Sequence, residues 1–219
     1  MLAARSALFA ILCFSICATA QTRTLHVYPG AASGLDSVTT NSLELELKRV
    51  LTPAGIVPAW VKTSGKADGN VEMERLVVGT FEGNCSVENL PSSAAPVRTR
   101  TLADTSVSNN RILPYFRVDC ARVIRTLAPT LQPLSVPFRE AILGRALARV
   151  IAHEIYHILA ETADHQDFGV AKAQLSLADL TAVRFDLSPA SLRRMQPPDL
   201  PGAPVTRNAG LTALVQPAR

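Results

Sequence analysis

The sequence lacks the patterns that mark several large classes of protein. Its 22 Lys and Arg residues are scattered over 219 positions and give a net charge of +4, so no basic stripe indicates binding to nucleic acid or to a membrane surface. No internal repeat indicates a solenoid. No C-x-x-C pair is present, and histidine is scarce, with four residues in the whole chain. Because histidine is so rare here, two histidines at a spacing that suits a metal site would seldom occur by chance.

The N-terminal segment predicts export. Arg5 precedes an apolar stretch at 7–16, and Ala18-Thr19-Ala20 stands before Gln21. This order of charged, apolar and small residues is typical of a signal peptide over residues 1–20. The alternative is a membrane anchor, but the apolar stretch is short for a bilayer and no basic cluster follows it. We expect a secreted protein, extracellular or periplasmic, without stable membrane insertion; loss of Arg5 lowers its net charge from +4 to +3.

Cysteine is also sparse, and its placement predicts one disulfide. Of the four cysteines, Cys13 and Cys17 lie in the expected signal peptide. Cys85 and Cys120 remain as an even pair in an oxidising compartment, where a disulfide is the expected state. The alternative is two separate buried thiols. Neither cysteine is near a histidine pair in the sequence, so we do not expect either to bind a metal.

Apolar periodicity and turn residues predict short strands and helices in alternation. The expected strands are 24–28, 56–62, 74–81 and 112–120, and the expected helices are 42–51, 121–127, 138–160, 176 to about 185, and 189–195. Residues 91–111 are rich in Ser, Thr, Pro and Asn, so we expect mostly loop there, and a proline-rich link at 129–137.

These elements predict an α+β fold. We expect one small domain over residues 21–195, in which a short mixed sheet packs on a long helix and helical segments follow. From Gln196 onward the chain has five prolines and few large apolar residues, so residues 196–219 are expected to form a disordered tail.

The long helix carries the most informative motif, His153-Glu154-Ile-Tyr-His157. Residues four apart lie one turn apart on the same helix face, so both imidazoles can reach one metal ion. Glu154 lies beside them and can accept a proton from a metal-bound water. The competing interpretation is a pair of core histidines, but a glutamate between them is an odd choice for a buried face. His26 is expected on a strand surface, without a functional role.

A zinc site with an open position needs a third protein ligand, and His165 is our candidate. Glu161 competes, since a carboxylate also binds zinc, but it lies only one turn after His157 and would require a nearly straight helix. Asp164 and Asp167 are further oxygen donors nearby. We expect these two to be solvated loop charges or partners of a histidine N–H.

The run His153-Glu-Ile-Tyr-His157-Ile-Leu-Ala-Glu-Thr-Ala-Asp-His165 resembles the zinc site of the metzincin branch of the zincin metallopeptidases. That family extends the motif to H-E-x-x-H-x-x-G-x-x-H and places a methionine turn below the metal. Here Ala160 stands at the family glycine, so the helix is expected to run past it by part of a turn before the chain reverses. Ala163 stands at the third family histidine, and His165 comes two residues later. The resemblance covers residues 145–172.

The methionine turn is the second departure from the family. Gly169-Val-Ala-Lys172 stands where the turn is expected, but it has no methionine, and Met195 is the other candidate. The resemblance nevertheless implies a zincin-like domain, a Zn²⁺ cofactor and a peptide or protein substrate. In zincins the substrate lies antiparallel to an edge strand, for which 112–118 or the strand near Leu76 are the candidates.

The predicted reaction is hydrolysis of a peptide bond. Glu154 takes a proton from the metal-bound water and returns it to the leaving amine. Two other classes stay open. One is a non-catalytic zinc protein whose site is closed by a fourth ligand such as Glu161 or Asp164. The other is a zinc hydrolase that acts on a bond other than a peptide. The oligomeric state cannot be predicted from these residues.

Overall fold

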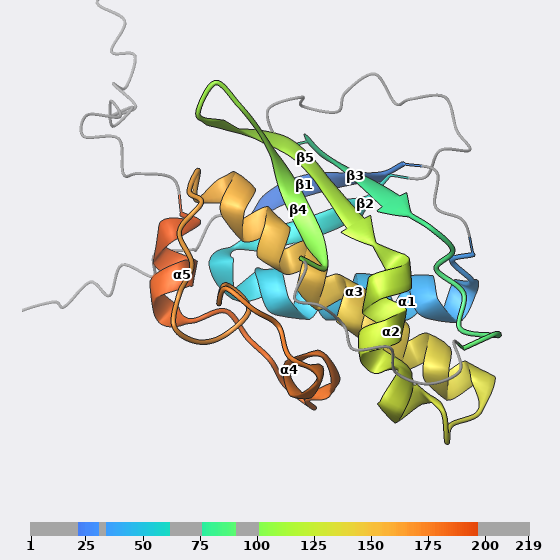
Figure 1. The fold of residues 1–219 in the computed structure, drawn as a ribbon. Helices are drawn as coiled ribbons and strands as arrows, with labels where there is room; N and C mark the ends of the chain where they lie inside the picture. The colour runs from blue at the N-terminus through green and yellow to red at the C-terminus, as the bar shows by residue number, and fades with distance from the viewer. Residues whose placement is uncertain (1–21, 31–33, 62–75, 91–100, 197–219) are drawn as a thin grey trace, which may run out of the picture.

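A computed structural model describes residues 22–30, 34–61, 76–90 and 101–196 (Figure 1). The expected signal peptide and the expected tail, apart from Gln196, lie outside this part of the chain. The elements are β1 (Arg23–Pro29), α1 (Ser37–Leu51), the 3-10 turn η1 (Thr52–Ala54), β2 (Ile56–Trp60), β3 (Leu76–Glu82), β4 (Ala103–Ser108), β5 (Arg111–Asp119), α2 (Cys120–Leu131), α3 (Val136–Leu159), α4 (Leu177–Thr181) and α5 (Pro189–Arg194).

The strands form one five-stranded sheet in the order β2-β1-β3-β5-β4. β2, β1, β3 and β5 run parallel, and β4 pairs antiparallel with β5 at one edge. The mixed sheet and the helices confirm the predicted α+β class. Among the described helices, none combines the length and the apolar character that crossing a membrane would require.

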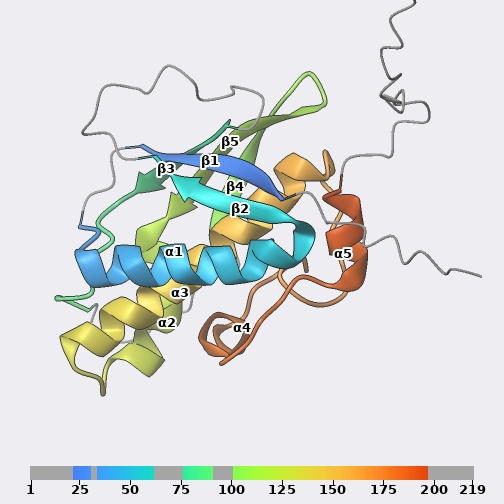
Figure 2. The same cartoon turned by 180° about the vertical axis from the view of Figure 1, so that it is seen from behind.

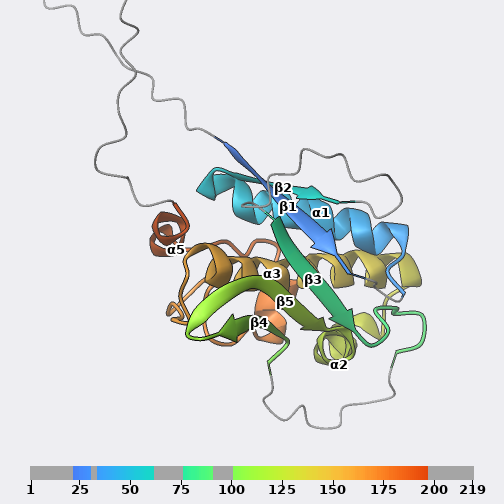
Figure 3. The same ribbon diagram turned by 90° about the horizontal axis from the view of Figure 1, so that it is seen from above.

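One face of the sheet is apolar because buried residues alternate along its strands. Val27 of β1, Val77 of β3 and Val118 of β5 are buried, whereas Thr80 and Arg117 on the intervening positions are exposed. Figure 3 shows the sheet lying over α1, α2 and α3, which cover this face. The core therefore sits between a layer of strands and a layer of helices.

The helix layer is built on the close approach of α1 and α3, which run side by side (Figure 2). α1 begins five residues earlier than predicted, because the Asp36 side chain accepts a hydrogen bond from the Thr39 main-chain N–H at 2.8 Å and caps the helix. Gly144 of α3 makes the approach possible, since a Cβ there would meet the Thr39 carbonyl oxygen and the Ser42 side chain.

Two predictions of irregular structure are partly wrong. Within 91–111, residues 103–108 form the edge strand β4, and Asn109 and Asn110 close the β4–β5 hairpin with positive φ angles of 49° and 60°. Asparagine is tolerated in this conformation, and two such residues favour a tight hairpin turn. The proline-rich link is also shorter than expected: Pro129 lies inside the last turn of α2, and α3 begins at Val136.

The two C-terminal helices begin where the sequence predicts, but α4 ends earlier than predicted. The Ser176–Asp179 capping box opens α4, which ends at Thr181, four residues short of the expected Phe185. Ser188 caps α5, which has a proline in its first turn.

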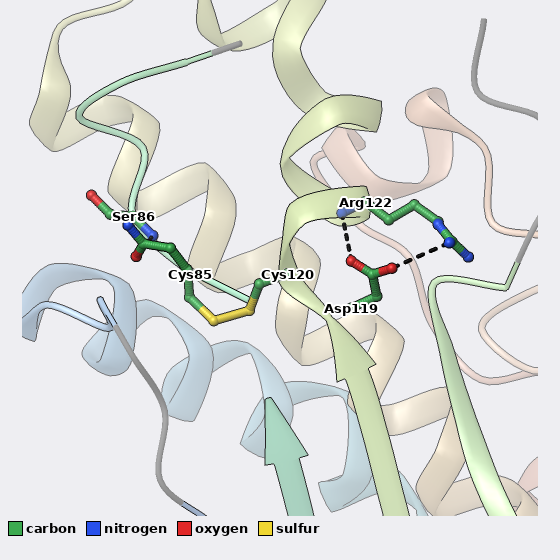
Figure 4. Close-up of a disulfide and its surroundings, with 6 residues drawn as sticks. Cys85, Ser86, Asp119, Cys120 and Arg122 are labelled. Atoms are coloured by element: carbon green, nitrogen blue, oxygen red, sulfur yellow. Dashed lines mark hydrogen bonds and ion pairs between the residues drawn. A yellow bond between two sulfur atoms is a disulfide. The ribbon is translucent and has the colours of Figure 1, made fainter. Parts of the chain in front are cut away.

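The predicted disulfide is present between Cys85 and Cys120 (Figure 4). It joins the segment after β3 to the first residue of α2, and both cysteines are fully buried. Asp119 caps the same helix by accepting from the Arg122 main-chain N–H at 2.9 Å. The bond therefore fixes the β5–α2 corner to the neighbouring strand of the sheet.

Candidate metal centre

The long helix α3 carries the motif in its last two turns. Ser135 stands at its N-cap and Pro137 in its first turn, where the missing proline N–H has no helical partner to lose. The helix ends at Leu159, so both motif histidines lie just before its C terminus. Figure 1 shows β4 crossing over this half of α3, so the motif lies beneath the edge of the sheet.

The chain reverses one residue after the position of the family glycine. Ala160 keeps a helical conformation with φ −87°, and Glu161 takes a left-handed one with φ 47°. A non-glycine residue in this conformation costs on the order of 1 kcal/mol. The Thr162 N–H donates to the His157 carbonyl at 3.2 Å, which secures the reversal. The loop then runs back along the helix and delivers His165.

The structure brings together the three predicted imidazoles. One ring nitrogen from each of His153, His157 and His165 lies within 4.8 Å of the others. The ring centroids are 4.7 Å apart for His153 and His157, 5.2 Å for His153 and His165, and 4.8 Å for His157 and His165. His157 is buried, His153 half-buried and His165 exposed, so the group is open on the His165 side.

Two carbonyl oxygens orient the helical histidines. The His153 Nδ1 lies 2.8 Å from the Val170 carbonyl, and the His157 Nδ1 lies 2.7 Å from the Thr162 carbonyl. A carbonyl oxygen can only accept, so each Nδ1 carries the proton and donates. The two Nε2 atoms of the neutral rings are then bare lone pairs, and they face each other at 3.0 Å. This donor set suits a cation, and such a hydrogen bond at the far ring nitrogen is what metal-binding histidines usually make.

Burial keeps these rings neutral. It lowers the pKa of His153 to about 4; the hydrogen bond to Val170 opposes this shift, and the neighbouring His157 and His165 add to it. Burial also lowers the pKa of His157, against the opposing hydrogen bond to Thr162. Neutral imidazole is the form that binds a metal, so the site favours a cation over protons near neutral pH.

Glu154 lies on the neighbouring helix face, under the edge strand β4. The residue is only 4% exposed, and its Oε2 accepts a hydrogen bond of 2.6 Å from the Thr105 hydroxyl. Burial raises the pKa of Glu154 to about 7; the Thr105 hydrogen bond opposes this shift, and the negative charge of Asp104 adds to it. A carboxyl group that titrates near neutral pH can both take and return a proton.

The other predicted oxygen donors lie outside the imidazole group. Glu161, Asp164 and Asp167 are exposed, and Asp164 lies 3.7 Å from the Arg194 guanidinium as an ion pair. In the described part of the chain, the one group of side chains placed to share a metal is the three histidines. His26 lies on β1, on the sheet face opposite the buried Val27.

The segment in the place of the methionine turn contacts a histidine. Gly169–Lys172 supplies the Val170 carbonyl to His153, and Val170 and Ala171 are fully buried. Met195 is also buried, but it closes α5, where its carbonyl accepts from the Arg23 guanidinium at 3.0 Å. The segment that contacts His153 therefore contains no methionine.

Three groups that contact the site residues were not predicted from the sequence. Thr105 lies in the segment that was expected to be loop, and the orienting acceptors on Thr162 and Val170 are main-chain carbonyls. The hairpin turn Asn109-Asn110 was a signal that could have identified β4 and its threonine. No residue type marks a carbonyl acceptor, so the other two could not have been found this way.

Comparison of the chain with protein-family models, with curated proteins and with solved structures finds no match.

Proposed function

We propose that the protein is a secreted zinc-dependent endopeptidase of metzincin-like type. The observation that carries the proposal is the convergence of three imidazoles beside a buried carboxyl group, with the Nε2 atoms of His153 and His157 left bare by the hydrogen bonds at Nδ1. Three nitrogen donors that leave room for water are a typical catalytic zinc set. Bound zinc would lower the pKa of its water towards about 7 and polarise a substrate carbonyl.

Some residues of the site would bind the metal, and another would transfer the proton. His153, His157 and His165 would hold the metal. Glu154 accepts the proton of the attacking water and donates it to the leaving amine. Thr105 occupies Oε2 of that carboxylate, so Oε1 is the oxygen left for the proton.

An open site supports catalysis over a purely structural role. A closed site would need a fourth protein ligand, for which Glu161 and Asp164 were the candidates. Both are exposed and lie outside the histidine group, and the group itself is open to solvent at His165. The geometry therefore favours the hydrolase over the non-catalytic alternative.

The edge of the sheet favours an extended peptide as the substrate. The expectation that 112–118 or the strand near Leu76 forms the edge is wrong, because β5 and β3 are both internal strands. The edge strand beside Glu154 is β4. An extended chain can pair with such an edge through main-chain hydrogen bonds, next to the strand that contacts Glu154. Export is supported by the N-terminal sequence and by the buried disulfide.

Metal content and peptidase activity, measured on the same samples, test the proposal. We expect about one zinc per chain in the wild type and loss of most of it in His165→Ala. Glu154→Gln should keep its zinc and lose peptide hydrolysis by at least about a hundredfold. His26→Ala, on the far face of the sheet, is the matched control and should change neither quantity.

Each opposite result removes a defined part of the proposal. Full zinc occupancy in His165→Ala would show that His165 is not the third ligand. A zinc-loaded wild type that cleaves esters but no peptide in a mixed panel would assign the hydrolase to a different bond. A zinc-loaded wild type inactive on both panels would assign a non-catalytic site.

A further inference from the structure

We propose that Thr105 is a positioning residue, whose hydroxyl holds one oxygen of Glu154 so that the other faces the metal. This inference rests on the proposed function. It goes beyond it by adding a residue of the edge strand to the machinery that orients the general base.

The contact is short and specific. The Thr105 Oγ1 lies 2.6 Å from Oε2 of Glu154 and 3.4 Å from the main-chain oxygen of the same residue. A hydroxyl has a single hydrogen, so it donates to the nearer atom, the carboxylate. Glu154 as a residue is 4% exposed, and a hydrogen bond to a buried charged group is stronger than one between neutral groups.

A carboxylate held at one oxygen cannot rotate freely about its last side-chain bond. That torsion is broad in a free glutamate, so several orientations are otherwise accessible. The Thr105 hydroxyl selects the orientation in which Oε2 faces β4. Since α3 fixes the backbone of Glu154 beside His153, we assign Oε1, the oxygen that Thr105 does not hold, to the metal side.

The register of β4 places the main chain of the same threonine at the sheet edge. The Leu102 carbonyl accepts from the Asp119 N–H at 2.9 Å, and hydrogen-bonded pairs alternate from there along an antiparallel ladder. Thr105 lies opposite Phe116, in a pair whose main-chain groups point away from the partner strand. Its side chain therefore reaches the base while its main chain faces the edge where an extended peptide would pair.

The neighbouring residue stabilises this arrangement from the other face of the sheet. Asp104 accepts from the Arg117 guanidinium at 2.9 Å and 3.1 Å, and Arg117 also lies 3.2 Å from Glu82. These exposed contacts link β4, β5 and β3. The strand segment before the irregular pairing at Thr105/Val107 is thus held in register over Glu154.

A double-mutant cycle with acetohydroxamate tests the inference without relying on turnover. A hydroxamate chelates zinc through its two oxygens and gives its hydroxyl proton to a nearby base, so its affinity reports whether Glu154 is oriented. The zinc-loaded proteins to compare are wild type, Thr105→Val, Thr105→Ser, Glu154→Gln and the double variant Thr105→Val/Glu154→Gln. Valine keeps the shape of threonine and removes the hydroxyl, whereas serine keeps the hydroxyl.

We expect Thr105→Val to weaken acetohydroxamate binding about tenfold, because binding must then order a carboxylate that Thr105 no longer holds. Thr105→Ser should stay within about twofold of the wild type, and Thr105→Val should have no further effect in the Glu154→Gln background. In peptide hydrolysis, Thr105→Val should lower kcat about tenfold or more and leave KM within about threefold.

Several results would overturn the inference. Equal weakening by Thr105→Val with and without Glu154 would show that Thr105 acts on the strand and not on the base. Equal loss in Thr105→Val and Thr105→Ser would assign the effect to the methyl group. If Glu154→Gln weakens hydroxamate binding and Thr105→Val does not, only the role of Thr105 is wrong. If the wild type does not bind hydroxamate through a metal, the proposed function itself fails, and this inference fails with it.

Discussion

Replacing Arg149 by methionine should destabilise the protein severely, although this residue is not one of the three histidines of the candidate metal centre. Its side chain is 0% exposed. It donates to Oε1 of Glu46 at 2.8 Å, to the Asp179 carbonyl at 2.6 Å and to the Ala182 carbonyl at 2.8 Å. One guanidinium thus ties α3 to α1, to the middle of α4 and to the C-cap of α4.

The cost can be worked from these three partners. Methionine fills a similar volume but leaves two carbonyls without their donor, at about 1–3 kcal/mol each. Breaking one side of a buried ion pair costs about 3–5 kcal/mol in full. Glu46 keeps a bidentate contact to Arg49 at 2.8 Å and 2.9 Å, so its charge is not left alone. We therefore expect about 4 kcal/mol, against a typical total stability of about 5–15 kcal/mol.

Urea unfolding followed by circular dichroism at pH 7 measures this loss. Arg145→Met is the matched control, because Arg145 lies one turn earlier on α3 and is only half-buried. The control should stay within about 1 kcal/mol of the wild type. If Arg149→Met also stayed within that range, the contacts of the guanidinium with α1 and α4 would not stabilise the fold as proposed.

Part of the difference in unfolding free energy between the wild type and Arg149→Met should disappear at acid pH. Burial raises the pKa of Glu46, but hydrogen bonds from Arg49 and Arg149 and the charges of both outweigh it, so the net pKa lies below the ordinary 4.5. A carboxyl group with a lowered pKa in the folded state contributes stability that is present above its unfolded pKa and lost as pH falls below it. The gap between wild type and Arg149→Met should therefore narrow between pH 7 and pH 3.5. The share from the two carbonyls does not titrate and should remain, whereas a gap that stays fully constant over this range would show that the Arg149–Glu46 ion pair contributes nothing to it.

Two further predictions concern the packing of α3 and its buried carboxyl group. Gly144→Ala should cost about 1–3 kcal/mol in thermal unfolding, because a new Cβ would meet the Thr39 carbonyl and lie 2.7 Å from the Ser42 side chain; an unchanged Tm would refute the tight contact. In the metal-free protein, burial raises the pKa of Glu154 from 4.5 to about 7, so the folded state favours the protonated group and stability should fall as pH rises through that window. Glu154→Gln should abolish this dependence in urea unfolding with a chelator present, and a wild type and variant with parallel pH profiles would refute it.

The elements with strong periodicity were predictable from the sequence. Leu43 and Leu47 of α1 and Val77 and Phe81 of β3 are buried at the spacing of a helix and a strand, respectively. β4 was missed because only Ala103 at its start is buried, and the rest of the strand is polar or exposed. An edge strand with one covered position has the composition of a loop, so composition alone could not identify it.

In the candidate site too, the features set by local sequence could be predicted, and those set by tertiary structure could not. The spacing of His153 and His157 follows from helix geometry, so their convergence could be predicted. The approach of His165 depended on where the chain reverses, and that point is set by the conformation of Glu161. The partner of Glu154 depended on the register of β4 over α3, which is a tertiary property that no local pattern contains.

The late position of His165 can be explained by how its loop is held. The family pattern places the third histidine six residues after the second, and here the interval is eight. Reversal at Glu161, one residue after Ala160, uses part of that extra length. The loop is then held on both sides of His165: the Thr162 carbonyl accepts from His157, and the Val170 carbonyl accepts from His153. Each helical histidine is therefore oriented by the loop that carries His165, so a change that frees either carbonyl should loosen all three imidazoles together.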